Sequence, residues 1–329
     1  MPLSLRRGRV TAVVEASDDF VRLEVDGAPC VAYPLLTGAV EVGDDVVVNV
    51  QARELGLGSG GFDVLYANLT RGLDLRAEEG AHVMKLPYTP VQFARRHAEE
   101  DGPLDDGLAR MPVVCCTLHS QVAPVCAALR GLRVAYVQLP GGALPVALSD
   151  AIRALKALDL LEVAIGAGAC FGGDVDCVNV YSSLLFAAGR NVDAVVCSIG
   201  PGIVGTGTFF GHGGMAAADA VDAANRLGGT PILALRISTA DARGRHSGLS
   251  HHTTAVLGLR GSLRVAWPAG LELDGESLPA GAETVDVSDW REACAGLPLD
   301  HMGRGPDDDP WFFAAAYAAG RLARLAAAR

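Results

Sequence analysis

The feature that most constrains the fold is a series of five apolar runs in the second part of the chain. Each run lacks polar alternation, as is typical of strands that are buried on both faces of a sheet. Helical patterns separate the runs, and the strand starts lie roughly 20–40 residues apart, as in βαβ units. The sequence therefore predicts an α/β fold with a doubly wound, mostly parallel sheet in three layers. The runs span residues 112–117, 133–138, 161–165, 192–199 and 231–237.

The first part of the chain has a different pattern. Short runs of β-branched residues alternate with turn residues, which predicts a small SH3-like or OB-like β-barrel over residues 1–80. A connector with a helix is expected at residues 81–110. The α/β domain then spans residues 111–329.

Two further elements are expected near the end of the chain. Residues 253–259 and 263–267 are apolar runs on either side of a polar turn at residues 260–262, and this pattern predicts a hairpin. Asp309 and Pro310 are typical of a helix N-cap and first helical position, so a final helix is expected to begin there.

Charge limits the classes of partner. The 329 residues include 27 Lys and Arg against 38 Asp and Glu, which gives a formal net charge of −11. An acidic chain repels phosphate backbones and anionic lipids, so neither nucleic acid nor a membrane is expected as a partner. Residues 194–218 carry no charged side chain. Their many glycines and Pro201 nevertheless disfavour the continuous helix that spanning a bilayer requires.

The cysteine pattern helps to predict the cellular compartment of the protein. Eight are present, and none forms a C-x-x-C pair, which argues against zinc-ribbon and thioredoxin motifs. Arginines near the start of the chain are followed by strand-like residues instead of an apolar segment, so no secretion signal is expected. The protein is therefore predicted to be cytoplasmic, with reduced thiols.

Polar and glycine-rich segments follow the predicted strands of the α/β domain. The carboxyl ends of parallel strands meet at one edge of a sheet, and ligands of open α/β sheets bind there. The sequence therefore predicts a functional site at this edge. The candidate residues after the first, third, fourth and fifth strands are His119; Asp174; Gly200, Gly202, Gly205, Thr206, Gly207 and Thr208; and Asp241, Arg243, Arg245, His246 and His251.

Residues 200–205 match the G-x-G-x-x-G pattern of dinucleotide-binding loops. Two features argue against that function. Pro201 lacks an amide donor, and the next helix is expected to begin near Gly213 instead of at the second glycine. We favour a loop whose amides, next to Thr206 and Thr208, bind an anion. A tight turn with packing glycines is the structural alternative.

The charged residues after the fifth strand suggest complementary roles. Arg243 and Arg245 can bind a carboxylate or phosphate in a bidentate manner. His119, His246 and His251 are candidates for proton transfer, because histidine titrates near neutral pH.

Metal ligation is an alternative use of the same histidines. His246 with either His251 or His252 could begin a metal site that His119, His212 or Asp174 completes. Adjacent residues of a strand point to opposite faces, so His251 and His252 are not expected to share one metal. No metal ligand is assigned, and the cofactor is left open.

Two residues outside these groups are further candidates for catalysis. Lys85 is one of only two lysines in an arginine-rich chain, and it lies in the expected connector. We predict a functional amine there, and a surface or salt-bridge role is the alternative. Cys170 lies in a glycine-rich loop, where a thiolate could act as a nucleophile, but no local protease signature surrounds it.

Six segments carry a resemblance to a known family. They are residues 55–61, 84–92 (M-K-L-P-Y-T-P-V-Q), 118–121, 200–208, 235–253 and 302–305. In this order, they resemble the uncharacterised bacterial domain-of-unknown-function family three-eight-six-six. The resemblance implies a cytosolic bacterial protein, and it implies no activity, cofactor or catalytic residue.

These patterns lead to one functional hypothesis and one alternative. The hypothesis is an enzyme, a hydrolase or a transferase, that acts on a small anionic or phosphorylated metabolite at the carboxyl ends of the strands. The alternative is a non-catalytic ligand-binding or regulatory protein, for which a homodimer is left open.

Overall fold

The computed structural model describes residues 3–56, 61–259, 261–273 and 278–328. Residues 57–60 of the first family-like segment and residue 260 of the expected hairpin turn lie outside the described residues. The chain divides into two compact units, residues 1–96 and residues 97–329.

The first unit contains a closed barrel of five strands in the order β1-β2-β3-β5-β4. Its core is made of alternating apolar residues such as Val10, Leu23, Val48 and Leu65. This confirms the small N-terminal barrel. Short helices and an antiparallel hairpin of β6 and β7 also belong to the unit. The bounds are β1 Leu5–Ala16, β2 Val21–Val25, β3 Ala28–Ala32, α1 Pro34–Thr37, β4 Asp45–Asn49, α2 Gln51–Glu54, β5 Asp63–Asn68, β6 Val83–Lys85 and β7 Phe93–Arg95.

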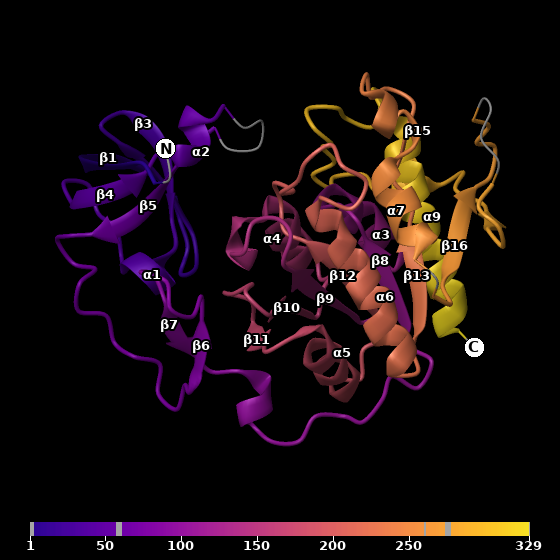
Figure 1. Cartoon of the computed structure of the whole chain (residues 1–329), viewed down its shortest axis with the longest axis horizontal. Coiled ribbons are helices and arrows are strands. Elements are labelled where there is room, and N and C mark those ends of the chain that lie inside the picture. The colour runs from indigo at the N-terminus through magenta and orange to yellow at the C-terminus, as the bar shows by residue number, and fades with distance from the viewer. Residues whose placement is uncertain (1–2, 57–60, 260, 274–277, 329) are drawn as a thin grey trace. The chain divides into compact units, whose positions relative to one another are not determined.

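The second unit contains an eight-stranded sheet in the order β11-β10-β9-β12-β8-β13-β16-β17 (Figure 1). Its strand pairings are parallel, which confirms the doubly wound α/β fold. The strand bounds are β8 Pro112–Cys116, β9 Val134–Leu139, β10 Val163–Ala167, β11 Val175–Cys177, β12 Ala194–Ile199, β13 Thr230–Ala234, β16 Arg264–Pro268 and β17 Glu283–Val285. A separate antiparallel pair consists of β14 Ile237–Ser238 and β15 Gly248–Leu249.

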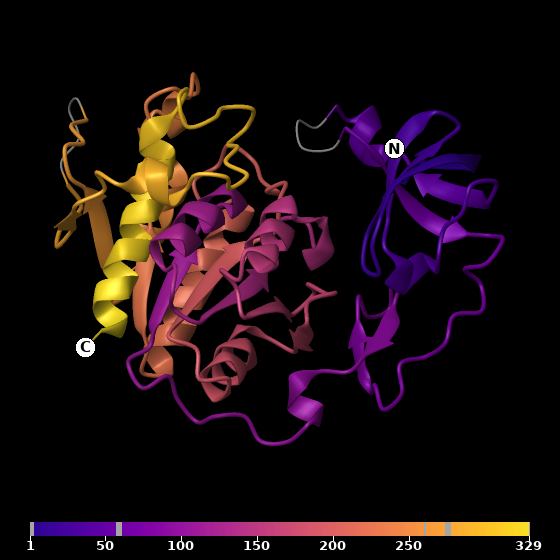
Figure 2. The same cartoon turned by 180° about the vertical axis from the view of Figure 1, so that it is seen from behind.

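Helices cover both faces of the eight-stranded sheet (Figures 1 and 2). Helices α3, α4, α8 and α9 pack in one hydrophobic cluster, and α5, α6 and α7 pack in another. Alternate residues of each central strand belong to the two clusters, so the clusters lie on opposite faces. The helix bounds are α3 Val122–Ala128, α4 Asp150–Ala157, α5 Val180–Gly189, α6 Ala216–Arg226, α7 His251–Gly258, α8 Trp290–Ala293 and α9 Pro310–Ala327.

The direction of the chain after the central strands changes at β8. Strand β8 is followed by α3 on one face, whereas its neighbours β12 and β13 are followed by α6 and α7 on the other face. In open α/β sheets, ligands bind where the chain reverses in this way. The loops after β8, β12 and β13 therefore define where a site is expected.

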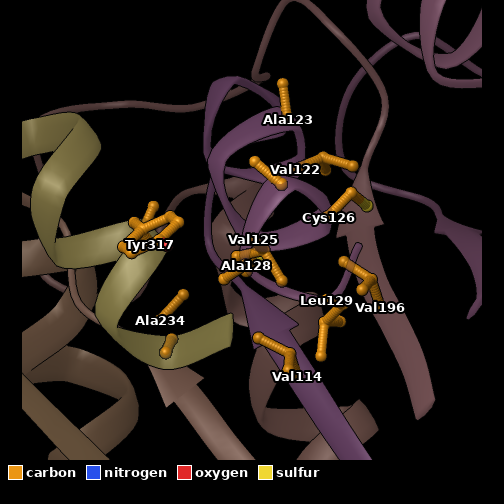
Figure 3. Close-up of a cluster of buried hydrophobic side chains, with 14 of the residues drawn as sticks. Val114, Val122, Ala123, Val125, Cys126, Ala128, Leu129, Val196, Ala234 and Tyr317 are labelled. Atoms are coloured by element: carbon orange, nitrogen blue, oxygen red, sulfur yellow. The ribbon is translucent and has the colours of Figure 1, made fainter. Parts of the chain in front are cut away.

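Helices α3 and α9 approach each other closely. In Figure 3, Val125 and Ala128 lie on the side of α3 next to α9, which carries Tyr317. A Cβ atom on Gly320 of α9 would lie 2.5 Å from the carbonyl oxygen of Val125 and 2.7 Å from the Cβ of Ala128. The glycine therefore permits the helix–helix contact that builds this half of the core.

The expected hairpin at residues 253–267 is wrong. Residues His251–Gly258 form helix α7, which the side chain of Ser250 caps by accepting a hydrogen bond from the amide of His252. Strand β16 then pairs in parallel with β13. A parallel pairing requires a crossover and cannot be made by a tight turn, so α7 takes the place of the expected strand.

Two other sequence features have clear structural outcomes. Helix α9 begins after its N-cap residue Asp309, as expected. The uncharged residues 194–218 form β12, a loop, η4 (Gly213–Met215) and the start of α6. Among the described residues, we find no helix that combines the length and the apolar character needed to cross a membrane.

Candidate functional site

Segments after β12 and β13 bring four histidines together. His212 precedes η4, His246 ends η5 (Gly244–His246), and His251 and His252 begin α7. The His212 and His252 rings are stacked with centroids 3.9 Å apart, and the centroid of the His251 ring is 4.4 Å from that of His252. The centroid of the His246 ring is 4.7 Å from that of His251. We call these four residues the histidine cluster.

This geometry corrects the expectation that His251 and His252 face apart. They lie in the first turn of a helix instead of a strand, and both rings contact that of His212. The cap residue Ser250 also lies 2.8 Å, through Oγ, from Nδ1 of His246. The start of α7 therefore organises the cluster.

Backbone carbonyls fix the tautomers of two of these rings. Nε2 of His212 donates to the carbonyl oxygen of Phe209 at 3.1 Å, and Nδ1 of His251 donates to that of Arg245 at 3.3 Å. The opposite nitrogens, Nδ1 of His212 and Nε2 of His251, are buried and have no hydrogen-bond partner among the described residues. A buried polar atom without a partner costs about 1–3 kcal/mol, so these two nitrogens are available to a ligand that would satisfy them.

The histidine rings are held in their neutral forms. Burial, reinforced by the positive charges of Arg236 and Arg243, lowers the pKa of His246 to about 3. Burial also lowers the pKa of His212 and of His251. At neutral pH, these rings therefore present lone pairs and not positive charges.

A buried network of charges lies beside the cluster. Nη1 of Arg236 donates to Nδ1 of His252 at 2.9 Å, and Nη2 of Arg236 is 3.7 Å from Oδ2 of Asp241. Arg243 binds both carboxylate oxygens of Asp241, at 2.9 and 2.7 Å, and Arg304 contacts the same carboxylate at 3.3 Å. Hydrogen bonds from Arg243 hold the pKa of Asp241 well below its usual range. Asp241 and Arg243 therefore bind each other and fix the segment that carries the site.

Arg245 has a different environment. Its side chain is exposed and forms no ion pair with any described residue. Its Nη1 lies 3.9 Å from the position that a Cβ of Gly207 would take. Its carbonyl oxygen also accepts the hydrogen bond from His251. Arg245 therefore connects the loop after β12 with the histidine cluster.

Close packing accounts for several glycines in the loop after β12. A Cβ on Gly200 would lie 2.1 Å from the carbonyl oxygen of Ala143, and one on Gly205 would lie 2.8 Å from the Cβ of His212. Gly202 has a φ of 71°, in the left-handed region that favours glycine. The packing role that we left open for these glycines thus has direct structural support.

The tip of the same loop is exposed and carries two hydroxyls. Those of Thr206 and Thr208 lie 2.8 Å apart, and the Thr206 amide donates to the carbonyl oxygen of Gly211 at 2.7 Å. Helix α6 begins only at Ala216, well after Gly202. A dinucleotide loop instead places its pyrophosphate directly on the helix N-terminus, so this loop does not have that geometry.

His119 lies at the carboxyl end of β8, in η2 (His119–Gln121). Its Nδ1 donates to the carbonyl oxygen of Ile199 at 3.1 Å, and its Nε2 is 2.6 Å from Oγ of Ser149. The Ser149 hydroxyl also accepts the amide of Ile152 and so caps α4. Burial lowers the pKa of His119 to about 4. The ring therefore links three strand-end segments.

Three other candidate residues have different surroundings. Asp174 forms an ion pair with Lys156, and its Oδ2 accepts the amide of Ala164 near the amino end of β10. The Cys170 side chain is fully buried. Lys85 ends β6 in the first unit, and its side chain is buried.

The sequence reasoning missed Arg236 and His301. Arg236 lies within an apolar run that predicts a strand, and a charged residue in such a run is itself a signal of a buried polar site. His301 stacks on Phe312 with centroids 3.7 Å apart, and its Nδ1 is 3.2 Å from Oγ of Ser120. His301 lies in an irregular segment after the sheet, where no strand-end pattern points to it.

A cleft of about 920 Å³ opens at the opposite edge of the sheet. Its lining includes Pro112, Thr230 and Arg264, the first residues of β8, β13 and β16. No histidine or cysteine is among its lining residues. The candidate site is therefore identified by its chemistry and by the strand order, not by the size of a cavity.

The fold and the site define a class of protein with a small barrel and a doubly wound α/β unit whose carboxyl edge carries clustered histidines and arginines. Residues 29–320 match the family model described as Protein of unknown function (DUF3866). The chain belongs to this family, which confirms the resemblance found in the sequence. No curated protein matches the chain.

Proposed function

We propose that the protein is an enzyme, a hydrolase or a transferase, that acts on a small anionic metabolite such as a phosphate ester at the carboxyl edge of its sheet. The observation that carries this proposal is the exposed Arg245 guanidinium, which has no ion-pair partner among the described residues and whose positive charge acts on the neutral ring of His251. An unpaired guanidinium offers bidentate hydrogen bonds to a phosphate or a carboxylate.

The loop after β12 supplies the other proposed contacts to the anion. Gly205, Thr206, Gly207 and Thr208 are exposed on the same loop that Arg245 approaches. The amides of Gly205 and Gly207 and the hydroxyl of Thr208 can donate hydrogen bonds to phosphate oxygens. In this proposal Gly200 and Gly202 shape the loop, and the pair of Asp241 and Arg243 holds the segment that carries Arg245.

Proton transfer is assigned to histidines of the same edge. His246 and His251 lie next to Arg245, and His119 lies at the end of the neighbouring strand β8. A neutral imidazole can accept a proton from water or from a hydroxyl group that attacks the anion. The ligand-binding role of Asp174 and the catalytic role of Lys85 remain predictions. Asp174 forms an ion pair with Lys156, and Lys85 belongs to the first unit.

Binding of the anion is tested by calorimetric titration of chelator-treated protein with inorganic phosphate. We expect Arg245→Ala to weaken phosphate binding at least about tenfold, because a hydrogen bond to a charged group contributes about 1.5–3 kcal/mol. Arg226→Ala is the matched control, since Arg226 is an exposed arginine of α6 that pairs with Asp222. Equal phosphate affinity in the wild type and in Arg245→Ala would contradict the proposal.

Catalysis is tested by a turnover assay on a panel of phosphomonoesters that includes p-nitrophenyl phosphate. We expect His246→Ala to keep phosphate binding and to lose turnover. Lys85→Arg removes the primary amine and keeps the charge, so unchanged turnover in that variant would dismiss a catalytic role for Lys85.

A non-catalytic ligand-binding protein is the second candidate. It is favoured by the aromatic pair Phe209 and Phe210 at the tip of the loop after β12, where the side chains are 48% and 57% exposed. Exposed aromatic residues beside a ligand site are typical of a surface that contacts a partner. A phosphate-dependent change of sedimentation coefficient without any turnover would support this candidate and a homodimer.

We also propose that the protein works in the bacterial cytoplasm, as the family resemblance implies. The eight cysteines are free thiols, and reduced thiols are the rule in that compartment.

A further inference from the structure

We propose that His212, His251 and His252 bind a divalent transition-metal cation, with zinc as the cation that best fits their chemistry. One ring nitrogen from each of the three residues lies within 4.8 Å of the other two. Three imidazoles are a ligand set of catalytic zinc sites, in which a fourth position stays open for water or substrate. The inference rests on the proposed function, because it adds a metal next to the proposed anion site.

Two of the three ligands are already oriented for a metal. Nε2 of His212 and Nδ1 of His251 each donate to a backbone carbonyl oxygen, so Nδ1 of His212 and Nε2 of His251 carry the lone pairs. Both of these nitrogens are buried and have no hydrogen-bond partner among the described residues. Residue His212 as a whole is only 6% exposed to solvent. Metal-binding histidines almost always donate their other N–H to a carbonyl or a carboxylate in this manner.

His252 supplies the third ligand at the expense of one existing contact. Its Nδ1 accepts a hydrogen bond from Nη1 of Arg236, so the proton of the neutral ring is on Nε2. Ligation through Nδ1 displaces the Arg236 guanidinium and keeps the Nε2 proton, whereas ligation through Nε2 requires that proton to move to Nδ1, which ends the same hydrogen bond. In either case the imidazole stays neutral and Arg236 is released. Arg236 can then turn to Asp241, whose Oδ2 is 3.7 Å from its Nη2. The proton and the positive charge are thus accounted for in either case.

The charges around the proposed site favour an anionic ligand at the open position of the metal. Three neutral imidazoles leave the double positive charge of the cation uncompensated, so its open position favours an anionic ligand. Arg245 is exposed, its carbonyl oxygen orients His251, and its Nη1 lies 3.9 Å from the position that a Cβ of Gly207 would take. An anion held between the cation and Arg245 satisfies both positive charges. In this arrangement His251 serves as a ligand, and His246 is the remaining cluster residue for proton transfer.

The test uses the full chain, stripped with a chelator and titrated with Co²⁺ in phosphate-free buffer. Cobalt in a tetrahedral histidine site gives intense visible absorption bands that hexaaquo cobalt lacks. We expect one equivalent of Co²⁺ to produce these bands and one equivalent of Zn²⁺ to abolish them. His251→Ala and His212→Gln should each weaken Zn²⁺ binding at least about 100-fold.

His82→Ala is the matched control, because His82 is an exposed histidine of the first unit. It should leave the cobalt spectrum unchanged, and thermal unfolding should show that His251→Ala is folded. The inference is overturned if the wild type gives no visible bands, or if the cluster variants keep them. Phosphate binding by the stripped protein is measured separately, so a failed metal site and a failed anion site give different results.

Discussion

At the scale of single residues, the hydrogen-bond partners of a histidine decide what its ring can do. Both ring nitrogens of His119 are engaged, one with Ile199 and one with Ser149. His212 and His251 each have one nitrogen on a backbone carbonyl and the other without a partner. His119 therefore acts first as a link between segments, whereas the other two rings are available to a ligand.

The link through His119 leads to a prediction about acid stability. Because burial lowers the pKa of His119 to about 4 in the folded protein, the unfolded chain takes up the proton first, near pH 6.5. The free energy of unfolding should therefore fall as the pH drops from about 6.5 to 4, by up to about 1.4 kcal/mol per pH unit for this group. Above pH 6.5 the ring is neutral in both states and adds no pH dependence.

Urea unfolding between pH 4 and pH 8 measures this effect. His119→Gln lacks the titrating group, so its stability should depend less steeply on pH in that range while losing the contacts to Ser149 and Ile199 at all pH values. His82→Gln should keep the wild-type slope. If His119→Gln also keeps the wild-type slope, the neutral buried ring is not a source of acid sensitivity.

At the scale of elements, α7 shows where local sequence patterns mislead. Thr253, Thr254 and Val256 are β-branched residues that favour a strand, and the sequence analysis interpreted them in that way. The parallel pairing of β13 with β16 requires a crossover, and helix α7, which Ser250 caps, provides it. The wrong prediction also affected the candidate site. In the first turn of α7, the rings of His251 and His252 both contact the ring of His212, whereas adjacent residues of a strand would point to opposite faces.

The five strands β8, β9, β10, β12 and β13 could be predicted, because buried parallel strands are apolar runs that turn-forming residues interrupt. The short strands β11 and β17 were not predicted, and β16 was assigned to a hairpin. The list of strand-end residues followed from the same pattern and contained two of the four cluster histidines, His246 and His251. Three features of the site depend on contacts between distant segments. They are the tautomers of the histidine rings, the contact between Arg236 and His252, and the position of His301. No local pattern contains that information.

The contact between α3 and α9 supports a prediction about Gly320. Gly320→Ala places a Cβ 2.5 Å from the carbonyl oxygen of Val125, so the two helices must move apart. We expect a loss of about 1–3 kcal/mol in the free energy of unfolding, as for other overpacked cores. Gly189→Ala is the control, because Gly189 is an exposed helical glycine of α5 with no atom within 4 Å of the new Cβ.

The control should be neutral or stabilise the protein by up to about 1 kcal/mol, since alanine favours helices over glycine. Chemical denaturation of both variants gives the comparison. Equal effects of the two substitutions would mean that the helices adjust without strain and that Gly320 is not needed for their contact.

At the scale of the whole molecule, each unit has its own core. The barrel core draws on residues from Val10 to Leu65, whereas the two clusters of the large sheet draw on residues from Ala98 onward. A unit with its own hydrophobic core can fold independently. The histidine cluster, Arg236 and Arg245 all belong to the second unit.

We therefore predict that a fragment of residues 97–329 folds alone and binds Co²⁺ as the full chain does. Circular dichroism and thermal unfolding measure the fold, and the visible spectrum measures the site. A folded fragment without the cobalt bands would contradict this prediction.

The cysteines have a practical consequence for labelling the protein. All eight thiols are buried, and burial raises the pKa of Cys30, Cys197 and Cys294 to about 12. Thiol reagents attack exposed thiolates, so the native chain should be almost inert to maleimides and nitroxide labels. One new surface cysteine in each unit would then carry a spin-label pair on the otherwise natural sequence. Pulsed dipolar spectroscopy on that pair would follow the spacing of barrel and sheet as metal and phosphate are added.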